Sequence, residues 1–297
     1  LDGSAFFMLA VRMYPPIVLT VPLFPVFSQL GLLDSYWVLI ILYSPSANPD
    51  GQVKYNEWYS EHKGQPWEGR MPWQYHTYVG HDNNRDWIML HFPEQRLTAT
   101  EVFLRWHPLY SHEMHEMGGT GARMFVPPYE DPLDSNTPPQ IVNTMNIFGM
   151  AISSRLTAEG KGGVVMNAIF DLFTPARAFQ IYHGGGRILT ETARGNFART
   201  LTVLPEQMQR NPYGSAGFDP LKASWNFPMP WKPGDWTFRD RVEYQVSANF
   251  ALLNLAANNT YQFNINQFRA FQNALKGEGW PNAYIFPPEQ HNPGAAT

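Results

Sequence analysis

Residues 240–258 show the clearest helical pattern of hydrophobic positions in the chain. Apolar side chains recur every three or four residues, at Val242, Val246, Phe250, Leu253 and Ala257. This spacing predicts an amphipathic helix, and Asp240 near its first turn carries the negative charge that the positive end of a helix favours. A second segment has helical spacing at Met150, Ile152 and Leu156, and a Gly-Gly pair then breaks it.

Short uncharged runs that are rich in β-branched and aromatic residues predict buried strands. Residues 35–44 form one such run, and residues 164–170 form another after the Gly-Gly pair. A short strand is predicted at residues 188–190, with Glu191 at its end. Strands that are buried on both faces need helices to cover them, so the pattern predicts an α/β sandwich.

Two segments near the start of the chain lack a regular pattern. Residues 45–80 are punctuated by glycine, proline and aromatic residues, which predicts irregular surface structure. Between Arg12 and Asp34 the chain is uncharged and long enough to cross a bilayer, but its prolines disfavour a regular helix, so we expect a buried connector. We find no repeat and no linker, and we expect one domain over residues 1–297 in which residues 1–34 are a divergent apolar segment.

Composition excludes some classes of function. The chain has 297 residues, of which 44% are hydrophobic and 15% aromatic, so it can bury a large core. Its net charge is -4 and its 21 basic residues are scattered, which disfavours nucleic acid as a partner. Cysteine is absent, which excludes disulfides and thiolate metal sites but leaves the cellular compartment open.

The segment SHEMHEMGG, residues 111–119, places two histidines three positions apart. On a helix His112 and His115 would share a face, whereas in a strand they point to opposite faces and only one of them can face a given site. The nearby glycines disfavour a long helix. The spacing is not that of HExxH, which excludes a zincin-type metalloprotease. For either histidine the alternative is a structural role, held by hydrogen bonds.

Two polar segments contain candidate functional residues. In GHDNNRDW, residues 80–87, the guanidinium of Arg85 beside the amide of Asn84 suits capture of a carboxylate, and the alternative is a solvated turn. In ILTETA, Glu191 follows an apolar strand, where partial burial would suit a general base, and the alternative is a strand-end glutamate in water. The HGGG sequence at residues 183–186 is not accompanied by a GxSxG motif, so a serine hydrolase is excluded.

Seven segments resemble, in order, the zinc metallocarboxypeptidases of the carboxypeptidase A family, and especially a bacterial branch of large exported members. They extend over about residues 35–293 and are SANPDG, YVGHDNNRDW, HEMGGTGARMFVPPYEDP, EGKGGVVMNAIFD, YHGGGRILTETA, SWNFPMPW and AYIFPPEQHNPGA. The resemblance implies a three-layer α/β/α sandwich with a mixed, mostly parallel central sheet, here without its N-terminal strands. It also implies an extracytoplasmic protein: periplasmic, secreted or on the cell surface.

The family holds a zinc ion through the histidine and glutamate of an HxxE motif and through a later histidine. The resemblance assigns the later histidine to His115 and the general base to Glu191. It assigns the grip on the terminal carboxylate of the peptide to Asn84 and Arg85. The implied reaction is zinc-assisted hydrolysis that removes residues from the C-termini of peptides or proteins.

The sequence departs from the family because no HxxE motif occurs upstream of SANPDG, where the family needs it. Two explanations stay open. Either the two missing ligands lie before Leu1 and the protein is a carboxypeptidase, or the chain is an inactive structural or binding subunit of a larger assembly. The second predicts that residues 1–34 contact a protein partner or a membrane. The candidates for an arginine that stabilises the oxyanion are Arg70 and Arg123.

Overall fold

The computed structural model describes residues 48–69, 71–73, 76, 79–169, 171, 177–194, 200–208 and 217–277. The strand predicted at residues 35–44 and the apolar segment at residues 1–34 lie outside these ranges, as does Arg70. The described residues fall into two compact units. Residues 48–57 and His76 belong to the first unit, and the others belong to the second. The sheet and the candidate site lie in the second unit.

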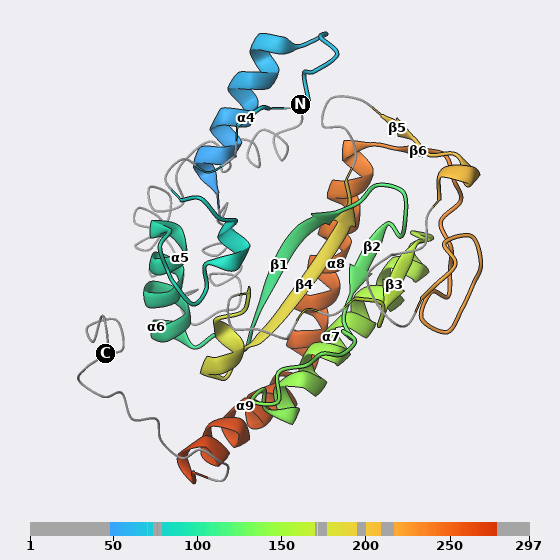
Figure 1. Ribbon diagram of the computed structural model, residues 1–297. Helices are drawn as coiled ribbons and strands as arrows, with labels where there is room; N and C mark the ends of the chain where they lie inside the picture. Colours follow the sequence, from blue (N-terminus) through green and yellow to red (C-terminus); the bar gives the residue numbers. More distant parts are fainter. Residues whose placement is uncertain are drawn as a thin grey trace, which may run out of the picture. The chain divides into compact units, whose positions relative to one another are not determined.

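Helices are the main element of the described chain (Figure 1). The longer ones are α4 (Pro49–His62), α7 (Pro139–Ala158), α8 (Phe238–Asn258) and α9 (Thr260–Leu275), and the shorter ones are α5 (Pro93–Thr98) and α6 (Leu104–Trp106). Single turns are η1 (Asn83–Arg85), the π-helical η2 (Ala99–Phe103), η4 (Gln180–His183) and η5 (Pro205–Gln207). Within the described ranges we find no helix that combines the length and apolar character of a membrane span.

A mixed sheet of four strands forms the centre of the second unit. Its strands are β1 (Tyr110–Met117), β2 (Met124–Val126), β3 (Val164–Met166) and β4 (Gly186–Ala193), arranged in the order β1-β4-β2-β3. The pairs β1–β4 and β2–β3 are parallel, and β2–β4 is antiparallel. The strands β5 (Leu201–Thr202) and β6 (Asp235–Trp236) form a separate antiparallel pair. The predicted α/β fold is confirmed in this general form.

Side chains alternate between two hydrophobic clusters on opposite faces of the sheet. Met124, Val126, Val164, Met166 and Ile188 join the cluster that contains α7, α8 and α9. Phe125, Val165 and Leu189 join a second cluster with Ala122, Ala168, Phe218 and Phe227. Figure 1 shows β1 and β4 side by side in front of α7 and α8. Because successive residues of a strand point to opposite sides, the short strands β2 and β3 are buried on both faces.

The helix predicted at residues 240–258 is confirmed as α8. Thr237 caps it: the hydroxyl oxygen accepts from the backbone N–H of Asp240 at 3.2 Å, and the carboxylate of Asp240 accepts from the backbone N–H of Thr237 at 2.7 Å. Its buried side differs from the predicted one, since Val246 and Phe250 are 41% and 54% exposed. The residues buried on α8 are Arg241, Tyr244, Ser247, Ala248, Ala251 and Leu252. Small side chains among them allow close packing against α7.

The prediction of irregular structure over residues 45–80 is wrong for the part that forms α4. The side chain of Asn48 accepts a hydrogen bond from the backbone N–H of Gly51 at 2.9 Å and so caps the start of this helix. Pro49 occupies the first helical position, where a missing N–H costs nothing. The proline and glycine that indicate a break elsewhere therefore start a helix here. The strand predicted at residues 164–170 is also shorter, since β3 ends at Met166.

Gly149 lies inside α7, where the helix meets the segment after β2. A Cβ atom at this position would overlap the carbonyl group of Pro127. We expect Gly149→Ala to lower the free energy of unfolding by about 1 to 3 kcal/mol, although alanine is the better helix former, because the neighbouring backbone must move. Urea unfolding measures the change. Gly118→Ala is the control, since nothing lies within 4 Å of its Cβ position, and an equal loss in both variants would contradict the packing argument.

Candidate functional site

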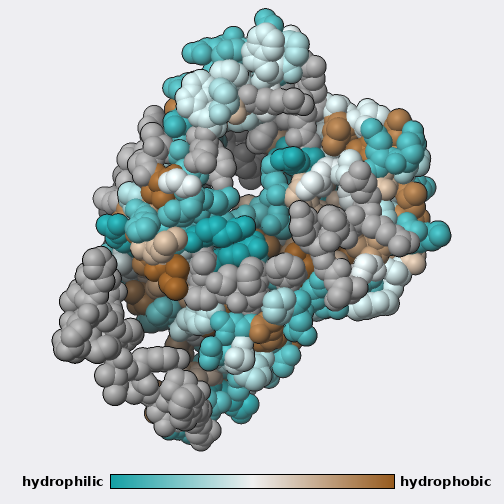
Figure 2. All heavy atoms as spheres, viewed as in Figure 1, coloured by the Kyte–Doolittle hydropathy of each residue, from teal (hydrophilic) through white to brown (hydrophobic). Residues whose placement is uncertain are grey.

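The parallel pairing of β1 and β4 places two of the predicted site residues side by side. In its register His115 is the partner of Glu191. Glu191 lies within β4 rather than after its end, because the strand extends to Ala193. The side chain of His115 is 27% exposed, so the site is open to solvent. Figure 2 shows hydrophilic residues gathered in the middle of this face, with apolar residues in separate patches.

His112 points to the other face of the sheet, toward α8. Its Nδ1 atom lies 2.8 Å from Oδ1 of Asn249, and its Nε2 atom lies 2.9 Å from Oγ1 of Thr190. Burial lowers the pKa of His112 to about 4, so the ring is neutral at pH 7. The prediction that the two histidines of a strand face opposite sides is confirmed. His112 has a structural role, and only His115 faces the site.

Asn84 is carried to His115 by the short helix η1. The carboxylate of Asp82 accepts from the backbone N–H of Asn84 at 2.7 Å and caps this turn. The side-chain oxygen of Asn84 accepts a hydrogen bond from Arg187 at 3.1 Å, and its Nδ2 atom lies 3.5 Å from Nδ1 of His115. Asn84 is buried, so the alternative of a solvated turn does not hold for this residue.

Arg85 follows Asn84 and is exposed. Its Nη1 atom donates to the backbone carbonyl of Asn84 at 2.9 Å. Its positive charge acts on Glu191 and opposes the effect of burial on the pKa of that carboxyl. The structure therefore brings together all four predicted residues: Asn84, Arg85, His115 and Glu191.

Glu191 combines burial with a gathering of positive charge. Burial raises the pKa of its carboxyl, while His115, Arg177, Arg187 and Arg85 act in the opposite direction. The Oε2 atom is shielded from solvent and has no hydrogen-bond partner among the described residues. A polar atom buried in this way calls for a ligand or a water molecule. The alternative of a fully solvated glutamate does not hold.

Arg187 is the residue on which the site is built, and sequence reasoning did not single it out. Its guanidinium is fully buried and contacts Asp171, Glu113 at 2.9 Å and Asn84 at 3.1 Å. Arg187 and Glu191 are four residues apart on β4, so their side chains lie on the same face of the sheet. This strand alternation is the sequence signal from which Arg187 could have been found. Burial alone would raise the pKa of Glu113, but Arg187 and His115 lower it to about 2.

Arg123 does not serve the site. Its guanidinium donates to the carbonyl oxygens of Gly119 and Gly121 at 2.7 Å and 3.0 Å, and it lies over the rings of Trp231 and Trp236. The hypothesis that Arg123 stabilises an oxyanion is therefore set aside. Arg177 is better placed, since its charge acts on Glu191, and its Nη2 atom lies 2.9 Å from Asp171.

A complete zinc site around His115 is not formed by the described residues. No group of three ligating side chains in these ranges includes His115. Glu113 lies 3.5 Å away, but Arg187 holds it. The only His-x-x-Glu sequence in the chain, at residues 91–94, follows SANPDG, and its histidine gathers with His81 and Asp86 instead. His115 therefore fits as one ligand, and the described part of the chain does not supply the others.

Comparisons with protein-family models, with curated proteins and with solved structures find no match for this chain. The most informative feature of the site is the buried Oε2 atom of Glu191, which has no hydrogen-bond partner among the described residues. The charges of one histidine and three arginines act on the same carboxyl group.

Proposed function

We propose that this chain binds the C-terminal carboxylate of a peptide or protein and hydrolyses the last peptide bond, with Arg85 and Asn84 as the carboxylate-binding pair and Glu191 as the general base. The observation that carries the proposal is the convergence of these residues with His115 at the β1–β4 pair. The three segments that contribute them lie far apart in sequence.

The arginines near Glu191 differ in what they can offer a substrate. Arg187 is buried between Asp171 and Glu113, which neutralise it. Arg85 is exposed, so a carboxylate can approach its guanidinium without burying a charge first. A planar guanidinium binds a carboxylate through two parallel hydrogen bonds, which gives it both affinity and direction. We therefore assign substrate binding to Arg85 and the positioning of Asn84 to Arg187.

Glu191 is suited to moving a proton. A base with a pKa raised toward neutrality accepts a proton from water and can return it to a leaving group. In the proposed reaction the water oxygen adds to the scissile carbonyl carbon, and Glu191 takes the proton of that water. The proton then passes to the amine nitrogen as the C–N bond breaks.

A metal would add to this chemistry. A zinc ion held by His115 and by ligands from outside the described residues would polarise the carbonyl and lower the pKa of a bound water. The described residues alone do not form that site, and the proposed roles of Glu191, Asn84 and Arg85 do not depend on it. We also propose that the sheet belongs to a carboxypeptidase-like three-layer sandwich, which is supported by its mixed pairing and its burial on both faces.

A second candidate function is recognition of the same carboxylate without hydrolysis. The observation that favours it is that no group of three metal-ligating side chains among the described residues includes His115, and that Arg187 already holds the neighbouring Glu113. Such a chain would be a binding subunit of a larger assembly. Binding would then depend on Arg85 as before, and no peptide bond would be hydrolysed.

Peptide binding tests the shared part of both functions. We expect a fluorescent hexapeptide with a free C-terminal carboxylate to bind at least about 10-fold more tightly than its C-terminal amide, because charge-assisted hydrogen bonds to Arg85 are lost in the amide. Arg85→Gln should remove the difference. Arg105→Gln is the matched control, since Arg105 is also exposed and paired with Glu101. Equal binding of the two peptides by the unchanged protein would overturn the proposal.

A further inference from the structure

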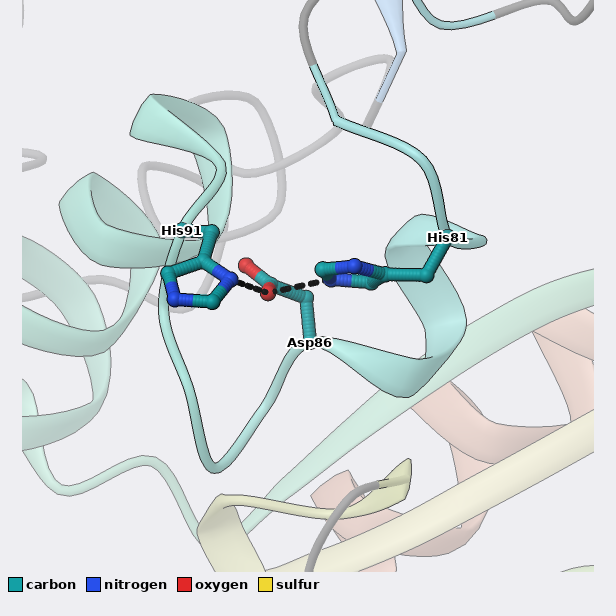
Figure 3. Close-up of side chains that lie close together, drawn as sticks. All are labelled: His81, Asp86 and His91. Carbon is teal, nitrogen blue, oxygen red and sulfur yellow. Dashed lines mark hydrogen bonds and ion pairs between the residues drawn. The ribbon is translucent and has the colours of Figure 1, made fainter.

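His81, Asp86 and His91 form a cluster on the loop that carries η1, separate from Glu191 and His115. The carboxylate of Asp86 lies between the two imidazole rings (Figure 3). Its Oδ1 atom is 2.7 Å from Nε2 of His81 and 3.9 Å from Nδ1 of His91. In the described part of the chain this is the one place where three ligating side chains bring their donor atoms within 4.8 Å of one another.

The carboxylate of Asp86 is held in a fixed orientation. Its side chain is fully buried, and its Oδ2 atom accepts from the backbone N–H of Phe92 at 2.7 Å. This hydrogen bond turns Oδ1 toward the two rings. A second partner that orients a carboxylate in this way is typical of metal ligands, because it reduces the freedom that binding must remove.

The backbone makes an unusual turn to bring His91 back to Asp86. Leu90 has a φ of 51°, in the left-handed region that residues other than glycine rarely adopt. The turn is held by the N–H of Leu90, which donates to the carbonyl of Asp86 at 2.8 Å. Arg96 adds two hydrogen bonds to the carbonyl of Leu90, at 3.2 Å and 3.1 Å. The backbone conformation of Leu90 is therefore unfavourable in itself, and it occurs where the chain turns to bring His91 next to Asp86.

The donor set and its spacing match a transition metal. In a tetrahedral zinc site with bonds of 2.0 to 2.1 Å, neighbouring donors are about 3.3 Å apart. The two separations here, 2.7 Å and 3.9 Å, lie on either side of that value, so shifts of about half an ångström in each ring would equalise them. Two imidazoles and one carboxylate favour zinc, copper or nickel over magnesium or calcium, which prefer oxygen ligands.

We propose that Nε2 of His81, Oδ1 of Asp86 and Nδ1 of His91 bind one divalent transition-metal ion such as Zn²⁺. The rings are 27% and 59% exposed, so solvent reaches the site and water can complete the coordination. The ion would tie together the two ends of the loop that contains η1. The proposal is independent of the proposed function, because none of these three residues belongs to the group around Glu191.

Titration of the untagged full chain with zinc chloride tests the proposal. We expect one ion to bind in isothermal titration calorimetry, and His91→Ala and His81→Gln each to weaken binding by about 100-fold or more, since each removes one of three ligands. His91 is exposed, so its variant should keep the fold, which the thermal unfolding curve without zinc will verify. Cobalt chloride gives a second readout, because the visible absorption of the bound ion reports its ligands.

His115→Ala separates this site from the one expected at β1. We expect this variant to bind zinc within about 3-fold of the unchanged protein. The proposal is overturned if the protein binds no zinc at about 100 µM, or if His91→Ala and His81→Gln leave binding intact. It is also overturned if His115→Ala alone abolishes binding, which would place the ion at the other site. In that last case the proposed function would gain support.

Discussion

Replacing Arg187 with methionine is expected to lower the free energy of unfolding by about 3 to 5 kcal/mol. The side chain is fully buried and pairs with the carboxylates of Asp171 and Glu113. Without the guanidinium, the fully buried carboxylate of Asp171 and the partly buried carboxylate of Glu113 lose a positive partner, and the side-chain oxygen of Asn84 loses its donor. Urea unfolding at pH 7, followed by far-UV circular dichroism, measures the loss.

The pH dependence of the free energy of unfolding tests specifically whether Arg187 stabilises the charged form of Glu113. The pKa of Glu113 is lowered to about 2 in the folded protein, so its contribution is present above the unfolded pKa, near 4.3, and is lost as the pH falls toward 2. Arg187→Met should reduce that loss. Arg155→Met serves as the control, because Arg155 on α7 forms a partly exposed pair with Glu159, the residue after this helix, and the substitution should change stability by less than about 1 kcal/mol. Similar losses in the two variants would contradict the role given to Arg187.

Changing Glu191 to glutamine is expected to reduce peptide hydrolysis by about 100-fold to 10,000-fold. The substitution keeps the shape of the side chain and removes its ability to accept a proton. We expect kcat to fall and KM to change little, because carboxylate binding is assigned to Arg85. Release of the C-terminal residue, followed by chromatography with zinc chloride present, measures both constants.

The pH profile links this loss to the carboxyl group. Burial raises the pKa of Glu191, so the rate should increase with pH through a value above the ordinary value of about 4.3. Glu101→Gln is the control, since Glu101 is exposed on η2 and should leave the rate unchanged. A Glu191→Gln protein as active as the unchanged one would remove this residue from the mechanism. If the unchanged protein binds the free carboxylate but hydrolyses nothing, the second candidate function is favoured.

Local patterns predicted some of the regular elements of the described chain, whereas α4, α5, α9 and β2 were not predicted. Helical spacing located α8 and part of α7, and apolar runs located β3 and β4. The buried side of α8 was misjudged because small residues such as Ala248 and Ala251 pack against α7 while the larger Phe250 stays exposed. The start of α4 was missed because the same proline and glycine suit both a turn and a helix cap.

The candidate site could be predicted only in part. Strand alternation within SHEMHEM predicted that only one of its two histidines can face a given site, and the family resemblance selected His115. The pairing of His115 with Glu191 joins segments more than seventy residues apart, and no local pattern contains it. Arg187 was missed because a charged residue beside three glycines indicates a loop. In the structure the buried carboxylate of Asp171 and the partly buried carboxylate of Glu113 pair with its guanidinium within the sheet. The regular spacing of five between His81, Asp86 and His91 was present in the sequence but belongs to no standard motif.

The parallel pairing of β1 with β4 limits which insertions and deletions these two strands can tolerate. Eight consecutive residue pairs fix the register, and a slip of one position would turn every side chain of the moved strand to the other face. His115 would then point toward α8, and the pair it forms with Glu191 would be lost although no residue type had changed. Insertions and deletions within either strand should therefore be far more damaging than most substitutions there. The number of residues in each strand therefore determines which side chains face the site, independently of which residues they are.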